Sequence, residues 1–177
     1  MEVLDVVKTV VLVSCLALAL IDDIREHRIR NKVTIPTAVL GMGINLVEGG
    51  TGGLVEAVVG WLVPVIVLLV FYLTKLIGAG DIKLFAAIGA VMGLHFVLAS
   101  FIISIWFGGA IALVLVIKRK QAGAVLSRLR EYILLCMVKQ GLEVYPNDSA
   151  GKFPFATAIV PATLVQLGIW VRGGNLI

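Results

Sequence analysis

Charged side chains are scarce in this sequence. Asp, Glu, Lys and Arg together make up 15% of its 177 residues, whereas 60% are hydrophobic. Soluble domains carry about 25% charged and about 45–50% apolar residues, so the composition excludes an ordinary soluble domain. Together with a mean hydropathy of +1.07, it predicts a polytopic membrane protein. Because the length allows one compact bundle, we predict a single domain over residues 1–177.

Cysteine and histidine are also nearly absent, with two of each. Cys15 and Cys136 lie in different predicted segments, and no CxxC pair occurs, so we expect neither a disulfide nor a cysteine metal site. His27 and His95 are predicted on opposite sides of the membrane, which argues against a shared metal. The sequence has no HExxH motif, no Ser/His/Asp set and no phosphate-binding loop. We therefore expect no metal and no other cofactor.

Six apolar runs, separated by short polar segments, predict an all-α membrane bundle of six transmembrane helices. The runs cover about Val6–Ile21, Val33–Val47, Leu54–Ile77, the segment from Asp81 to about Gly93, Phe96–Ile117 and Phe155–Val171. The fourth run is short and rich in alanine and glycine on one side, and small residues let helix backbones approach closely. This run is expected to pack tightly against a neighbour.

Residues 118–152 form the longest polar connection. Within it, apolar residues recur at helical spacing over 122–140, and arginines and a glutamate occupy the other side. A basic amphipathic helix of this kind most often lies flat on a membrane surface. We predict a cytosolic loop over 118–152 that carries a surface helix.

The basic residues predict the orientation of the bundle. They gather at residues 25–32, around Lys75 and Lys83, and at residues 118–152. The positive-inside rule places all three groups in the cytosol and the N-terminus outside. Because these residues flank apolar spans, nucleic-acid binding is a poor explanation for them. Asp23 and Asp81 then both lie near the cytosolic interface.

Asp23 and Asp81 are the strongest candidates for chemistry. A charge at the centre of a membrane helix costs roughly 2.5–3.5 kcal/mol on insertion scales, and such residues are functional candidates by default. Two nearby carboxylates share a proton, so one can accept a proton from water while the other donates to an amide carbonyl. Gly78 and Gly80, on either side of Ala79, would allow a tight turn and close approach of an extended substrate.

Other interpretations of these residues remain open. Asp81 can cap the helix that follows it, and Asp23 can pair with Arg25 or Arg28 in a solvated loop. Lys83 can be an interfacial anchor. For the whole chain, broken glycine-rich segments with a buried carboxylate also fit a small transporter or ion-conducting bundle. A non-catalytic assembly scaffold is the other alternative.

Three segments resemble the motifs of one family. Asp23–Asn31 is similar to D-I-R-x-x-R-I-P-N, Gly78–Gly93 to G-x-G-D-x-K-L…A-x-G…G, and Phe153–Ile159 to F-P-[FY]-[AG]-x-A-I. The chain thus resembles the type IV prepilin peptidases and archaeal preflagellin peptidases, which are GxGD-type aspartic proteases of membranes. It resembles a minimal form without the N-methyltransferase domain. Arg30 departs from the family's proline, and Asp22 is a minor rival to Asp23.

The resemblance implies an enzyme and its substrate. It implies an aspartic endopeptidase of the cell membrane that cuts pilin-like or flagellin-like precursors, which have a basic leader and an apolar helix, at the cytosolic face. Asp23 and Asp81 would be the catalytic residues. The supporting or substrate-binding residues would be Gly78, Gly80, Lys83, Arg25, Arg28 and Asn31. It implies no cofactor, and no oligomeric state is predicted.

Overall fold

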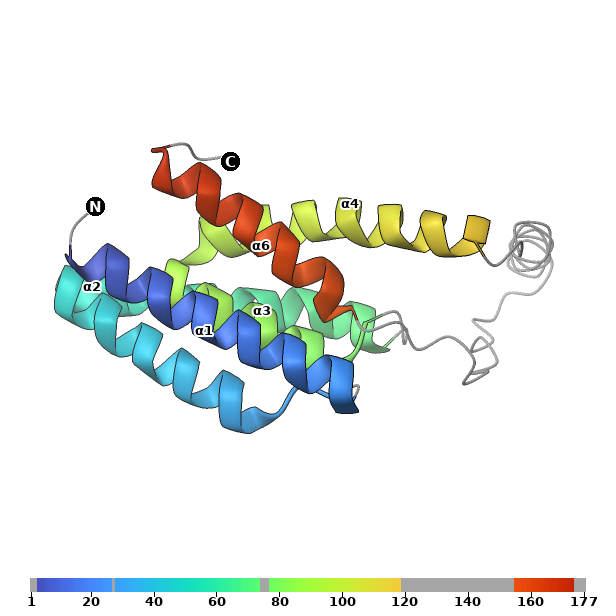
Figure 1. Cartoon of the computed structure of the whole chain (residues 1–177). Coiled ribbons are helices and arrows are strands. Elements are labelled where there is room, and N and C mark those ends of the chain that lie inside the picture. The colour runs from blue at the N-terminus through green and yellow to red at the C-terminus, as the bar shows by residue number, and fades with distance from the viewer. Residues whose placement is uncertain (1–2, 27, 74–76, 119–154, 174–177) are drawn as a thin grey trace.

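The computed structural model describes residues 3–26, 28–73, 77–118 and 155–173, and among these it contains helices and no strand. The helices are α1 (Val3–Glu26), α2 (Asn31–Leu73), α3 (Ala79–Met92), α4 (Leu94–Lys118) and α6 (Ala156–Val171) (Figure 1). The prediction of an all-α fold is confirmed for this part of the chain. The predicted surface helix at 122–140 lies outside the described residues.

Helix α2 is a bent element made of two arms. Its 43 residues are interrupted at Gly50, whose φ of 59° and ψ of −141° are not helical. A positive φ favours glycine because it has no Cβ, so Gly50 forms an elbow between a first arm (residues 31–49) and a second arm (residues 51–73). Figure 1 shows the second arm returning beside the first. The sequence predicted two separate helices here, and the structure joins them with a single non-helical residue.

Within the described part of the chain, three helices are long and apolar enough to cross a membrane: α1, α2 and α4 over Leu94–Leu115. The chain is therefore a membrane protein. The predicted number of six transmembrane helices is not supported, because α3 has only 14 residues and α6 only 16. A hydrocarbon core of about 30 Å requires about 20 helical residues. Gly93, with a φ of 85°, ends α3, and α4 begins at the next residue.

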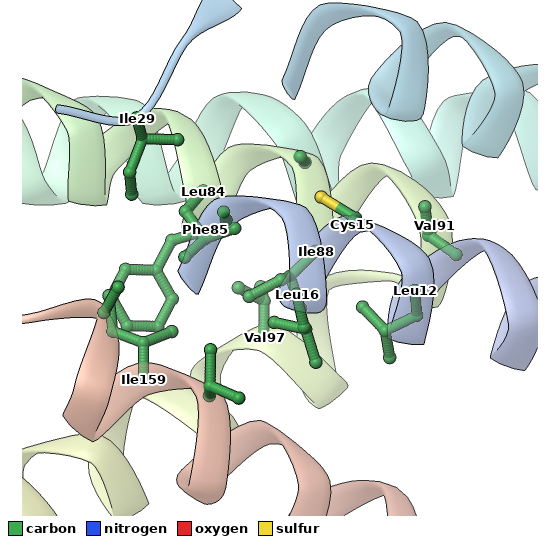
Figure 2. Packing of buried hydrophobic residues seen from close by; sticks show 14 of the residues in the cluster. Leu12, Cys15, Leu16, Ile29, Leu84, Phe85, Ile88, Val91, Val97 and Ile159 are labelled. Carbon is green, nitrogen blue, oxygen red and sulfur yellow. The ribbon is translucent and has the colours of Figure 1, made fainter. Parts of the chain in front are cut away.

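The short helix α3 lies at the centre of the core. Its residues from Leu84 to Val91 are all buried, as expected for a helix that is apolar on every side. Figure 2 shows Phe85 and Ile88 of α3 among Leu16 of α1 and Ile159 of α6. The Phe85 ring also meets the Phe101 ring of α4 edge-to-face, with centroids 5.4 Å apart. α3 is thus enclosed by the longer helices.

Close backbone packing fixes α3 against the second arm of α2. A Cβ added to Gly60 would lie 2.3 Å from the Gly89 carbonyl oxygen, and one added to Gly89 would lie 1.9 Å from the Gly60 oxygen. Only glycine permits this approach at either position. The prediction that the small-residue run packs tightly is confirmed.

Polar contacts near the elbow fix the C-terminal end of α3. The Asn45 amide of the first arm donates to the Ala90 and Val91 carbonyl oxygens, each at 3.1 Å. Close to the elbow itself, Lys8 of α1 pairs with Glu48. The last turn of α3 therefore lies toward the elbow, and its first turn, with Asp81, lies at the opposite end of the bundle.

Candidate active site

Asp23 reaches the interior because it continues the buried stripe of α1. Leu12, Leu16 and Ala19 precede it at helical spacing and are all buried, and Asp23 itself is only 6% exposed. The backbone N–H of Ala156, the first residue of α6, donates to its Oδ2 at 3.1 Å. This bond joins the end of α1 to the start of α6. An N–H donor complements a carboxylate, which only accepts when it is ionised.

Asp81 is buried in the first turn of α3, with 8% of its surface exposed. The backbone N–H of Gly78, the residue before the helix, donates to its Oδ2 at 3.2 Å. The sequence suggested instead that Asp81 precedes the helix and caps the N–H groups that follow it. Burial raises the pKa of Asp81 to about 6, the Gly78 N–H opposes the rise, and the Asp23 charge adds to it. Asp81 lies at the end of α3, outside the three helices of membrane-spanning length.

The structure thus brings Asp23 and Asp81 to one end of the bundle. They come from two helices and are near enough for one carboxylate to raise the pKa of the other. Each uses Oδ2 to accept a backbone N–H, and these bonds exist together with the electrostatic interaction between the two carboxylates. Arg25 and Arg28, the sequence-based alternatives for pairing with Asp23, are exposed.

Gly80 has a packing role in the structure. A Cβ at Gly80 would lie 3.3 Å from Cβ of Ile29, and Ile29 is buried between α1 and α2. The first turn of α3 can therefore approach the connecting segment closely. Gly78 precedes the helix in an extended conformation, with φ −77° and ψ 150°, and it supplies the N–H that Asp81 accepts.

Lys83 and Asn31 contact each other and not the carboxylates. The Lys83 Nζ donates to the Asn31 Oδ1 at 2.8 Å, and both residues are exposed. Since Asn31 begins α2 and Lys83 lies in the second turn of α3, this bond links the two helices beside the candidate site. The sequence motifs contain both residues, but their contact was not predicted.

Arg30 and Asp22 belong to a separate cluster, in which Arg30 is exposed and Asp22 is partly buried. The Arg30 guanidinium pairs with Glu26, and its Nε lies 4.0 Å from the Asp22 Oδ1. Arg30, which replaces the family's proline, is therefore directed at Asp22 and Glu26. The spacing of four residues between Glu26 and Arg30 was a signal for this pair in the sequence. Asp23 is the aspartate that shares an electrostatic interaction with Asp81.

The contact from Ala156 was missed by the sequence analysis. Its only signal was the motif Phe153–Ile159, whose middle residue is Ala156; residues 153 and 154 are outside the described ranges.

In the described residues, no group of three His, Cys, Asp or Glu side chains is arranged to hold a metal ion. The described chemistry of this site is that of two carboxylates and backbone N–H groups.

A family model described as the type IV leader peptidase family matches residues 10–113, which is more than half of the chain. The match includes Asp23–Asn31 and Gly78–Gly93 and ends before Phe153–Ile159. Searches of the curated proteins and of the solved structures give no significant match. The match across both aspartate segments agrees with the resemblance that the motifs indicated, and the chain belongs to the type IV leader peptidase family.

Proposed function

We propose that the chain is a membrane aspartic endopeptidase in which Asp23 and Asp81 activate water. The observation that carries this proposal is the pair of buried carboxylates at one end of the bundle, of which Asp81 has a raised pKa. Such a pair retains one proton near neutral pH. Membership of a leader peptidase family makes peptide hydrolysis the reaction to expect from it.

The different surroundings of the two aspartates suggest their roles. Asp81, with its pKa near 6, holds the shared proton and donates it to the oxygen of the scissile carbonyl. Asp23, which accepts the Ala156 N–H, takes a proton from water as the water oxygen bonds to the carbonyl carbon. When the C–N bond breaks, Asp23 gives that proton to the leaving nitrogen, and Asp81 recovers its proton from one of the two hydroxyls on the carbonyl carbon as the new carboxyl group forms. No covalent intermediate with the enzyme forms.

The proposed substrate is a pilin-like or flagellin-like precursor with a basic leader followed by an apolar helix. The basic residues beside α1 and α3 favour a cytosolic position for this end of the bundle, with the N-terminus outside. Since α3 and α4 form a hairpin that starts near Lys83 and ends at Lys118, both ends of that hairpin are then cytosolic. The scissile bond of a membrane-inserted precursor would meet the carboxylates at the membrane edge.

Purified variants in detergent, assayed with a pilin-like precursor, test the proposal. Asp23→Asn and Asp81→Asn should each reduce cleavage by roughly 10²-fold or more. This value is the lower end of the rate enhancement that a general acid or base typically contributes. Asparagine keeps an oxygen that accepts the Gly78 or Ala156 N–H, so the fold should persist. The double variant should lose little more than either single one, because residues that act as a unit fail together.

Asp22→Asn is the matched control and should keep most of the activity. Substantial cleavage by Asp81→Asn would exclude the mechanism and favour a scaffold in which the aspartates only cap helices. Activity in Asp23→Asn with loss in Asp22→Asn would instead move the first aspartate by one residue. A transporter would leave the precursor uncut in every variant and in the unaltered protein.

A further inference from the structure

A cavity of about 540 Å³ lies between the two arms of α2 and the first two turns of α3. Its volume is within the range of about 300–1,000 Å³ that ligand pockets have. It is lined by Ala79, Ile82 and Lys83 of α3, whereas Phe85 and Ile88, at helical spacing from Asp81, face the core. The cavity therefore lies beside the two carboxylates without containing them.

The lining of the cavity has a polar end and a long apolar remainder. Asn31, Tyr72 and Lys83 lie where the arms of α2 end and α3 begins, at the same end of the bundle as Asp81. Met42 and Trp61 mark the other end, each eleven residues farther along its arm. Eleven helical residues extend about 16 Å, which is about half of a 30 Å hydrocarbon core. The cavity is thus as deep as one leaflet's acyl chains.

Lys83 determines the sign of the ligand's charge. It donates one of its three hydrogens to Asn31, and no carboxylate forms a salt bridge with it within the described ranges. A cationic entrance attracts an anionic headgroup and repels the basic leader of the proposed substrate. Basic pockets between membrane helices on the cytoplasmic side typically bind lipid headgroups.

We propose that this cavity binds one anionic phospholipid, with its phosphate at Lys83 and Asn31 and one acyl chain between the arms of α2. The depth of the cavity, its apolar lining and the charge at its entrance each match a different part of such a molecule. The assignment goes beyond the proposed peptidase function and does not require it. Because Lys83 and Asp81 share α3, the bound lipid would also fix the turn that carries Asp81.

The test measures lipid retained by the purified protein with native mass spectrometry, using phosphatidylglycerol and phosphatidylcholine with identical acyl chains. The unaltered protein should prefer phosphatidylglycerol by roughly fivefold, the effect of one lysine at an anionic surface. Lys83→Gln should lose this preference. Lys32→Gln, which removes an exposed lysine next to Asn31 that does not line the cavity, should keep it.

A second pair of variants tests the place of the acyl chain. Val39 lines the cavity and is 64% exposed, whereas its neighbour Leu40 is 56% exposed and does not line it. Val39→Trp should abolish retention of both lipids, and Leu40→Trp should not.

Several results would overturn the assignment. One is equal retention of the two lipids by the unaltered protein, and another is an equal effect of Lys32→Gln and Lys83→Gln. Retention by Val39→Trp at the unaltered level would place the lipid elsewhere. A photoreactive group at residue 39 that crosslinks a pilin-like precursor, and not lipid, would show that the cavity holds the substrate helix. Each of these measurements is independent of cleavage. If the peptidase proposal were wrong, the lipid measurements would still test the lipid site.

Discussion

The carboxyl group of Asp81 opposes folding when it is ionised. Its pKa rises from 3.8 to about 6 on folding, so between these pH values the folded state binds more protons than the unfolded state. The free energy of unfolding should therefore fall as the pH rises through this window and level off above it. A shift of this size corresponds to roughly 3 kcal/mol at most. The cost is one reason to expect that the residue is kept for function.

Asp81→Asn should remove this pH dependence. The variant should unfold at a higher temperature than the unaltered protein at pH 8, and the difference should shrink toward pH 4.5, where Asp81 is protonated in the folded state. Thermal unfolding in detergent at the two pH values measures both effects. In Asp22→Asn, the melting temperature should depend on pH as it does in the unaltered protein. If Asp81→Asn were less stable at pH 8, the charged cap at Gly78 would outweigh the cost of burial.

Lys83→Ala should reduce cleavage far less than Asp81→Ala does. The lysine bonds Asn31 at the surface, and water attack does not need it, so we expect a loss of about tenfold or less, the worth of one such hydrogen bond. Asn31→Ala breaks the same bond and should have the same effect. Initial rates with a pilin-like precursor compare the three variants. Complete loss in Lys83→Ala, with the fold intact, would give the lysine a direct role in the reaction.

At the scale of elements, the crossing of α2 and α3 depends on two glycines. Gly89→Ala would place a Cβ 1.9 Å from the Gly60 carbonyl oxygen, and backbone cannot move aside as a flexible side chain can. We expect a loss of about 1–3 kcal/mol in stability, the usual cost of overpacking, and a drop in activity as α3 shifts. The melting temperature in detergent measures the first effect.

Gly43→Ala is the matched control for that substitution. Gly43 also lies within a helix, but nothing is within 4 Å of its added Cβ. Alanine there should leave the protein unchanged or slightly more stable, because it restricts the unfolded chain. A loss for Gly43→Ala as large as that for Gly89→Ala would show that the contact with Gly60 is not the cause, because alanine has a higher helix propensity than glycine.

At the scale of the whole molecule, the elbow and the candidate site should lie on opposite sides of the membrane. Thr51 and Arg28 are exposed at these two ends. In a background with Cys15 and Cys136 changed to alanine, Thr51→Cys should react with an impermeant thiol reagent added outside intact cells. Arg28→Cys, and Ser127→Cys in the predicted surface helix at 122–140, should react only after the cells are opened. Outside reactivity at Ser127 would contradict the predicted topology.

The sequence alone determined the class of the protein and its two candidate aspartates. Composition and run length predict apolar helices because both are local properties. The charge clusters likewise predict that Asp23 and Asp81 lie on one side of the membrane. The motifs around them predicted the family that the match over residues 10–113 shows. The assignment of catalytic roles to these residues stays a prediction until the variants are assayed.

Tertiary structure alone decided what surrounds those residues. The sequence predicted a short fourth helix, but it did not reveal that α3 lies inside a shell of longer helices, that Ala156 donates to Asp23, or that Lys83 contacts Asn31. Each depends on which helices become neighbours. Hydrophobic periodicity identifies the buried face of a helix but not the element that covers it. The raised pKa of Asp81 follows from that covering, since desolvation and a nearby charge arise only when separate helices pack together.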